Sequence, residues 1–203
     1  MAASNKKQQL FDRWAPLYDC IFPSVFYQAT HKRLLDYVEL PKRCHVLDIG
    51  CGTGRLLNRL AAKYTDLQGT GLDFSPEMLR QARQSNRHRP RLIFVQGDVA
   101  PLRFADEQFD AVFNTLSFLH YSEPEQVFAE VYRVLRPDGR FYLVDPAAAA
   151  GIWHLPVSPN GIRLYSKTMR QQMGMQAGFE CSKHQFLLGP NLLTIFIKPS
   201  SLP

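Results

Sequence analysis

Short runs of β-branched and aromatic residues alternate with segments of helical periodicity from residue 44 onward. The runs predict five strands, at Cys44–Ile49, Leu67–Asp73, Arg91–Gln96, Phe109–Asn114 and Arg140–Asp145. The intervening segments carry apolar residues at helical spacing, and two have helix-start signals: a Ser75-Pro76 cap and a Ser122–Glu125 capping box. This alternation favours βαβ units around a parallel sheet, which is the α/β fold class.

The segments around this core predict helices at the beginning and a hairpin at the end. Residues 5–40 are helical in pattern, including a helix over Val25–Leu40, whereas residues 146–165 are rich in Pro, Gly and Ala and read as a loop. A helix over Ser166–Ala177 precedes two strands, Glu180–Leu188 and Asn191–Lys198, joined at Gly189-Pro190. We therefore predict one domain over 1–203: a helical cap (1–43), a core (44–145), a loop that could serve as a lid (146–165), and a terminal helix and hairpin (166–198).

Composition excludes several other classes of protein. The chain is 45% hydrophobic and 21% charged, as in ordinary globular domains. No apolar run approaches the roughly 20 residues that span a bilayer, and no apolar segment of a secretory signal follows Met1. The 4 cysteines lack C-x-x-C spacing, so we expect no metal site, no disulfide framework and a reducing cytoplasmic location.

The sequence HVLDIGCGTG at residues 45–54 combines a strand, a tight turn and a helix start. Gly50 permits the sharp turn, and Gly52 lets backbone N–H groups approach a ligand. A P-loop is excluded because no Lys follows, and Arg55 stands where a dinucleotide fingerprint needs Gly or Ala. The spacing Gly-x-Gly-x-Gly therefore indicates a different nucleotide loop.

Acidic residues follow the first three predicted strands. Asp48 lies beside the glycine turn, and Asp73 ends the second strand, where a carboxylate can accept hydrogen bonds from both ribose hydroxyls. Asp98 follows the third strand, within reach of an adenine amino group. Each acid alone could be structural, but the three together around one glycine turn predict a ribonucleoside site.

Five stretches resemble the ordered motifs of class I S-adenosylmethionine-dependent methyltransferases: VLDIGCGTG, GLDFSPEML, QGDVAPLRF, FDAVFNTLSFLH and VLRPDGRFYLVD. They cover about residues 44–145. The resemblance implies a Rossmann-like doubly wound sheet of seven strands in the order 3-2-1-4-5-7-6, with the last strand antiparallel. It also implies S-adenosylmethionine as cofactor, S-adenosylhomocysteine as product, and no metal.

The resemblance further implies cofactor-binding roles at matched positions. The methionine and ribose side would be lined by Asp48, Gly50, Cys51, Gly52 and Gly54. The ribose, adenine and underside of the cofactor would meet Asp73, Phe74, Asp98, Val99, Asn114 and Thr115. The stretch FDRWAPLYD at residues 11–19 is similar to a segment of type 11 ubiquinone/menaquinone C-methyltransferases that folds over the cofactor, which adds Tyr18.

Candidate catalytic bases lie after the predicted strands, where open α/β sheets bind ligands: His120, Tyr121, Asp145 and His154. An O- or C-acceptor usually needs a base, whereas a thiolate or amine can react without one. His120 could equally be a surface residue near a helix start. The apolar neighbours of His154, which include Trp153, could form an acceptor pocket or simply pack the loop.

The sequence favours a small, lipophilic methyl acceptor over nucleic acid. An Asn/Asp-Pro-Pro-aromatic run is typical of enzymes that methylate base amines, but after the fourth predicted strand the chain reads Asn114-Thr115-Leu116-Ser117. Methylation of cytosine C5 would need a Pro-Cys nucleophile, and none of the cysteines follows a proline. The net charge of +6 has a conspicuous source in Arg80, Arg83, Arg87, Arg89 and Arg91, which we interpret as a solvated face. A peripheral membrane contact, and the choice between monomer and homodimer, stay open.

Two other functions remain as alternatives at this point. A module with this fold could bind the cofactor without catalysis and contact a polyanion, which would fit the absence of an unambiguous base. A nucleotide-dependent oxidoreductase on a related fold is disfavoured by Arg55.

Overall fold

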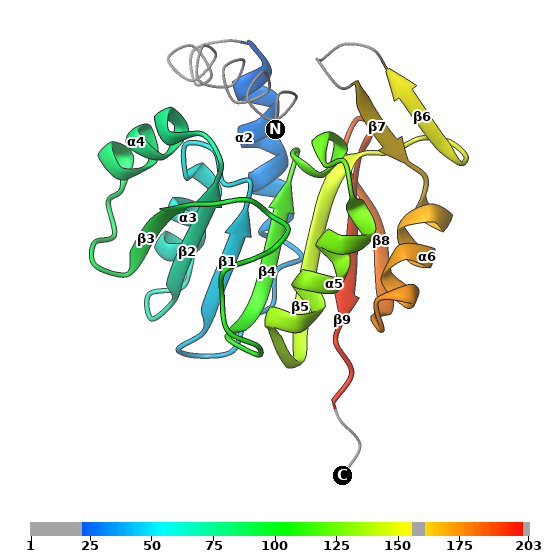
Figure 1. Ribbon diagram of the computed structural model, residues 1–203. Helices are drawn as coiled ribbons and strands as arrows, with labels where there is room; N and C mark the ends of the chain where they lie inside the picture. Colours follow the sequence, from blue (N-terminus) through cyan, green and yellow to red (C-terminus); the bar gives the residue numbers. More distant parts are fainter. Residues whose placement is uncertain (1–21, 156–160, 201–203) are drawn as a thin grey trace.

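The structure is a computed structural model that describes residues 22–155 and 161–200. Its centre is a twisted sheet with the strand order β3-β2-β1-β4-β5-β9-β8 (Figure 1). The strands span β1 His45–Ile49, β2 Gln68–Asp73, β3 Leu92–Gln96, β4 Phe109–Thr115, β5 Leu135–Pro146, β8 Glu180–Leu188 and β9 Asn191–Ile197. β9 is antiparallel to both β5 and β8, whereas β1 to β5 pair in parallel. Counted within this sheet the order is 3-2-1-4-5-7-6, so the predicted fold is confirmed.

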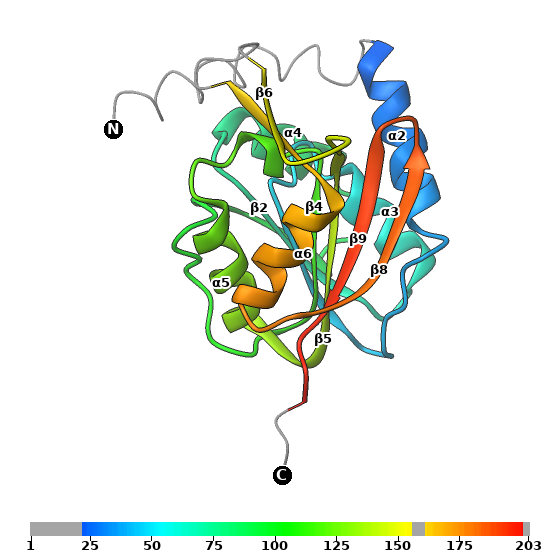
Figure 2. The same ribbon diagram turned by 90° about the vertical axis from the view of Figure 1, so that its right-hand side faces the viewer.

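Helices cover both faces of the sheet. The bounds are α2 Phe22–Leu34, α3 Arg55–Lys63, α4 Pro76–Ser85, α5 Pro124–Val134 and α6 Lys167–Gln176, with a short 3-10 turn η1 at Phe118–His120. The buried side chains form two apolar cores: one includes residues of α2, α3 and α4, and the other residues of α5 and α6. Figure 2 shows α5 and α6 on one side of the sheet and α2 and α3 on the other. Two apolar cores separated by a sheet are typical of a doubly wound fold.

The start of α4 follows the predicted capping chemistry. Ser75 Oγ accepts a hydrogen bond from Met78 N at 3.2 Å, and Pro76 occupies the first turn. The predicted capping box at Ser122–Glu125 is wrong, because α5 begins at Pro124 and its N-cap residue is Glu123, whose side chain caps nothing. One residue of offset is enough to remove the reciprocal bonds of that motif.

Residues 146–165 are not the continuous loop that composition predicts. They contain two short antiparallel strands, β6 Ile152–Leu155 and β7 Ile162–Tyr165, which form a separate small sheet. Tyr165 is buried, and its ring lies 5.4 Å from that of Phe118, which fastens this hairpin to the domain. Four-residue strands are too short for hydrophobic periodicity to identify them within a Pro- and Gly-rich context.

α2 also differs from its predicted bounds. It ends at Leu34 instead of reaching Leu40, although Val38 is buried as the pattern suggests. Figure 1 places α2 and the β6–β7 hairpin at the same end of the molecule, where β1 and β4 terminate. Among the described residues, no helix is both long and apolar enough to cross a bilayer.

Candidate functional site

The glycine turn connects β1 to α3 at the carboxyl edge of the sheet. Gly50, Gly52 and Gly54 all have positive φ angles, of +70°, +51° and +73°, a region that glycine enters without steric cost. The N–H groups of Gly50 and Cys51 both donate to the carbonyl of Leu72, at 2.8 and 3.0 Å. The turn is therefore fixed against the end of β2, and α3 starts directly beside it.

Asp73 joins the glycine turn to the end of β2. Its Oδ2 atom accepts a hydrogen bond from Gly52 N at 2.8 Å, and Oδ1 accepts one from Ser75 N at 2.9 Å. The carboxylate is 6% exposed and is held in one orientation by these backbone donors. An ionised carboxylate accepts up to about four hydrogen bonds, so a carboxylate ordered in this way suits a ligand with hydroxyl donors, such as a ribose diol.

Asp48 and Asn114 place buried acceptor atoms under the same turn. The amide nitrogen of Asn114 donates to the carbonyl of Ile49 at 3.0 Å, which joins the ends of β1 and β4. The Oδ1 atoms of both side chains are inaccessible and have no hydrogen-bond partner among the described residues. Burial and the charge of Asp73 raise the pKa of Asp48 well above its usual range. Asp48 is the register partner of Phe113, so the side chains of Asp48 and Asn114 point to opposite faces of the sheet on either side of the turn.

The residues implied at the adenine end lie at the neighbouring strand ends. Asp73 pairs with Gln96 across β2 and β3, so Asp98 follows the register partner of Asp73 by two residues. Asp98 is exposed, and its Oδ1 accepts from Val99 N at 2.7 Å. The side-chain amide of Gln96 donates to the carbonyl of Phe74 at 3.1 Å, so these residues meet at one edge.

A cleft opens between the glycine turn, the end of β4 and α2. It holds about 450 Å³ of space, which includes open solvent. Its lining residues are Tyr27, Gln28, His31, Gly50, Cys51, Gly52, Thr53, Arg55, Thr115 and Leu116. The structure thus brings together Gly50, Cys51, Gly52 and Thr115 as the family resemblance implies. Sequence reasoning missed the three α2 residues, which lie on one face of the helix at i, i+1 and i+4; the helix carries other polar residues, so this spacing gave no distinct signal.

The candidate bases have different environments. Tyr121 OH bonds Asn114 Nδ2 at 2.9 Å and Ser117 Oγ at 3.0 Å, and burial raises the pKa of this phenol. Asp145 is 1% exposed and accepts from Leu119 N at 3.2 Å, and burial raises its pKa to about 7. His120 is half-buried in η1, and His154 is exposed on β6. None of the four candidate bases lines the cleft, so their catalytic roles stay predictions. Tyr18, the predicted cofactor contact near the N-terminus, lies outside the described residues.

The arginine cluster largely serves the fold. Arg91 donates to the carbonyls of Ala61, Tyr64 and Leu67, at 3.0 to 3.3 Å. Arg83 donates to the carbonyl of Phe94 at 2.9 Å, and Arg80 pairs with Glu77 at 2.6 Å. These hydrogen bonds give Arg83 and Arg91 a structural role, although both keep their charge, and Arg80 is neutralised by its ion pair with Glu77.

Gly50→Ala tests how closely the turn is packed. A Cβ at Gly50 would lie 2.3 Å from Ser117 Oγ and 2.8 Å from Tyr121 OH, in a backbone region unfavourable for alanine. We expect a loss of roughly 2 kcal/mol or more in the free energy of unfolding, measured by urea denaturation. Gly52→Ala meets no atom within 4 Å and is the comparison variant. Equal losses in the two variants would show that the positive φ angle, and not contact with Ser117 and Tyr121, causes the loss in the free energy of unfolding.

The fold and site together define an α/β protein with a nucleoside-binding edge, and comparisons place it more closely. Residues 47–143 match the family model described as a methyltransferase domain. The 2-phytyl-1,4-naphtoquinone methyltransferase of Thermosynechococcus vestitus is 35% identical, over 68% of this chain and 63% of that protein. The demethylmenaquinone methyltransferase of Thermus thermophilus is 32% identical, over 70% of this chain and 69% of that protein. The chain belongs to the class I S-adenosylmethionine-dependent methyltransferase family.

A solved structure supports the fold. A SAM dependent methyltransferase from Aquifex aeolicus has a TM-score of 0.74 at 18% identity, over 90% of this chain and 97% of that one. The chain spans about two thirds of the length of the two curated relatives. The matched residues include the glycine turn and the ends of the neighbouring strands.

Proposed function

We propose that this protein transfers a methyl group from S-adenosylmethionine to a small, lipophilic organic acceptor by O- or C-methylation. The observation that carries the proposal is the Gly50–Thr53 turn, which lines the cleft and whose Gly52 N–H donates to the Asp73 carboxylate. This arrangement offers a partner for a ribose diol beside a cleft. S-adenosylmethionine carries a ribose diol.

The chain's own residues would bind and orient the donor. Asp73 would accept from the ribose hydroxyls, and Asp98 would meet the adenine edge. As the family resemblance implies, Asp48 would lie on the methionine side of the donor and Asn114 under it, and the positive end of the α3 dipole would lie near the donor's carboxylate. When bound, the cofactor supplies an electrophilic methyl group on a sulfonium. Orientation of an acceptor against it can contribute about 7–11 kcal/mol to lowering the barrier.

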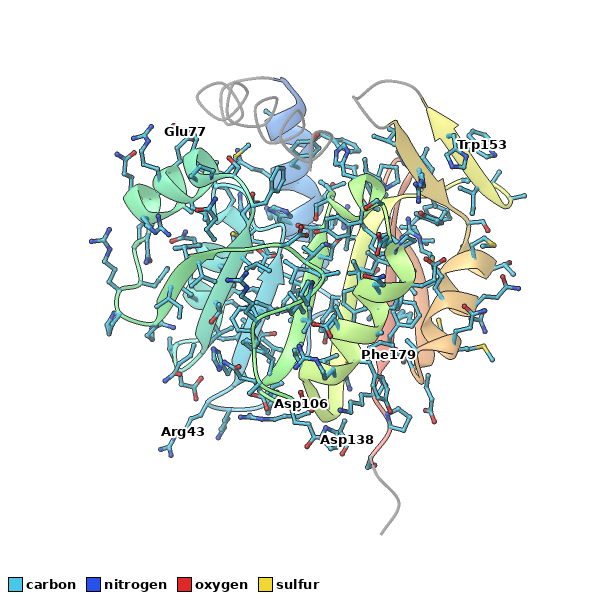
Figure 3. The ribbon with its side chains drawn as sticks, viewed as in Figure 1. Arg43, Glu77, Asp106, Asp138, Trp153 and Phe179 are labelled. Atoms are coloured by element: carbon cyan, nitrogen blue, oxygen red, sulfur yellow. The ribbon has the colours of Figure 1, made fainter. Side chains whose placement is uncertain are left out.

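A lipophilic acceptor is supported by the β6–β7 hairpin. Ile152 and Trp153 are 40% and 52% exposed, although large apolar side chains are usually buried. Figure 3 shows Trp153 at the end of the molecule that carries α2, whereas Arg43, Asp106 and Asp138 lie at the opposite end. The relatives named above act on a phytylated naphthoquinone and a demethylmenaquinone, by their names. Exposed apolar side chains at the end of the molecule that also carries the cleft suit acceptors of this class.

Incubation with methyl-labelled S-adenosylmethionine tests the proposal. The protein is mixed separately with the lipid and the water-soluble fractions of a cell extract, and with a chemically reduced phytyl-naphthoquinone as a defined probe. We expect label in the lipid fraction. Label confined to the water-soluble fraction would contradict a lipophilic acceptor. If the protein binds S-adenosylhomocysteine but labels neither fraction, the result would favour a module that binds the cofactor without catalysis.

A further inference from the structure

The β6–β7 hairpin has one face against the domain and the other toward solvent. Tyr165 on β7 is buried against Phe118, and side chains alternate between the two faces along a strand. Leu164 therefore points away from the domain, together with its register partner Trp153 on β6. The hairpin thus presents a half-exposed tryptophan to solvent from a regular strand.

Other exposed side chains gather beside the base of this hairpin. Ser166 N donates to the carbonyl of Gly151 at 2.9 Å, so the start of α6 lies next to Ile152 at the start of β6. In the first turn of α6, Lys167 Nζ lies 5.0 Å from the ring centroid of Phe186 on β8, and both side chains are exposed. We name this surface the hairpin patch, and it consists of Ile152, Trp153, Lys167 and Phe186.

The part of the chain that carries the hairpin patch is nearly free of acidic residues. From residue 146 to the end of the sequence the only acid is Glu180, whereas the basic residues are Arg163, Lys167, Arg170, Lys183 and Lys198. Glu123 and Glu125 stand at the start of α5 beside η1, toward which the buried Tyr165 points. The first turn of α6 contains no acid, so the positive end of its dipole adds to the charge of Lys167. The hairpin patch therefore suits anionic groups.

This combination of side chains favours a lipid surface over a second protein. Stable protein interfaces bury about 800 Å² on each partner and are depleted in lysine, whereas the hairpin patch is small and has Lys167 within it. Surfaces that bind membranes combine tryptophan, phenylalanine and aliphatic side chains with lysine. Tryptophan is also enriched at the level of the lipid headgroups. An anionic bilayer thus matches both the apolar and the charged members of the patch.

We propose that the hairpin patch docks this protein on an anionic lipid bilayer, with Trp153 in the headgroup layer and Lys167 against lipid phosphates. The inference goes beyond methyl transfer, because no residue of the patch lines the cleft. Figure 3 shows Trp153 at the end of the molecule that carries α2, which is also the end that carries the cleft. Docking would hold this end toward the lipid phase, in which lipophilic acceptors dissolve.

Sedimentation with lipid vesicles tests the proposal on the full chain. We expect the protein to bind vesicles of phosphatidylcholine and phosphatidylglycerol, and to bind them less as salt screens the charges. Trp153→Ala should lower the vesicle partition coefficient roughly 10-fold, because the variant loses the apolar area of the ring. Lys167→Gln should lower it roughly fivefold on these vesicles and leave binding to pure phosphatidylcholine unchanged.

Matched variants separate the hairpin patch from exposed side chains in general. Ile152→Ala should weaken vesicle binding, whereas Ile93→Ala, at an exposed isoleucine on the edge strand β3, should not. Lys42→Gln removes an exposed lysine next to Arg43, at the opposite end of the molecule, and should have no effect (Figure 3). Equal effects within either pair would mean that general hydrophobicity or net charge, and not this patch, causes the binding.

Two further outcomes would overturn the docking surface. One is a wild-type protein that does not bind the anionic vesicles. The other is a dimer in gel filtration that Trp153→Ala dissociates, since a second copy of the chain would then cover the patch. Methyl transfer without vesicle binding would contradict this inference alone, whereas vesicle binding by a protein that does not bind S-adenosylhomocysteine would contradict only the proposed function.

Discussion

Asp73→Ala is expected to weaken S-adenosylhomocysteine binding by on the order of 100-fold or more. The change removes two charge-assisted hydrogen bonds to the ribose, worth about 1.5–3 kcal/mol each. It also removes the acceptors of Gly52 N and Ser75 N, so the glycine turn loses the carboxylate that orders it. Because 5′-methylthioadenosine, a nucleoside thioether without the amino-acid end, carries the same ribose, its affinity should fall as well.

The Asp73 measurement needs a control for folding and for net charge. Asp36→Ala removes an exposed acid beyond the end of α2 and should leave affinity unchanged. Circular dichroism of each variant checks that the sheet forms. An Asp73→Ala protein that is folded and binds S-adenosylhomocysteine as tightly as the wild type would show that the ribose lies elsewhere.

Arg170→Met is expected to lower the free energy of unfolding by about 3–5 kcal/mol, the range for breaking a buried charged network. Arg170 is completely buried, and its guanidinium donates to the carbonyls of Tyr165, Leu192, Asp145 and Pro146 at 2.9 to 3.3 Å. Methionine fills similar volume but leaves those carbonyls without donors. Burial raises the pKa of the Asp145 carboxyl and the charge of this guanidinium partly opposes that rise, so the substitution also makes ionisation of Asp145 more costly.

Urea denaturation near pH 7 measures this effect. Gln171→Ala, an exposed change at the next position of α6, is the comparison and should alter the unfolding free energy by less than about 0.5 kcal/mol. A loss below 1 kcal/mol in Arg170→Met would mean that water or neighbouring groups replace the guanidinium. That outcome would remove Arg170 as the link between β5, β7 and β9.

The parts of the structure that follow from sequence are those with local causes. The Gly-x-Gly-x-Gly spacing predicts positive φ angles, and the Ser75-Pro76 pair predicts the start of α4, because each depends on a few adjacent residues. The strand order follows from the family resemblance and from the hairpin signal at Gly189-Pro190. These signals also placed Asp73 beside the turn, where the structure finds it.

The parts that sequence could not supply depend on distant contacts. The bond between His31 and Thr115 joins segments whose local patterns are independent, and the buried state of Arg170 is invisible in a polar stretch of α6. The β6–β7 hairpin is stabilised by contacts such as Tyr165 with Phe118, not by its own composition. α2, the β6–β7 hairpin and Arg170 are positioned by such distant contacts, whereas the glycine turn comes from a contiguous motif.

The central claim is that the carboxyl edge of this sheet binds S-adenosylmethionine. Isothermal titration of the full chain with S-adenosylhomocysteine, and in parallel with NADH, measures it most directly. We predict one S-adenosylhomocysteine bound per chain, with affinity that depends on Asp73, and no binding of NADH. A folded protein that binds NADH but not S-adenosylhomocysteine, or neither, would contradict the account.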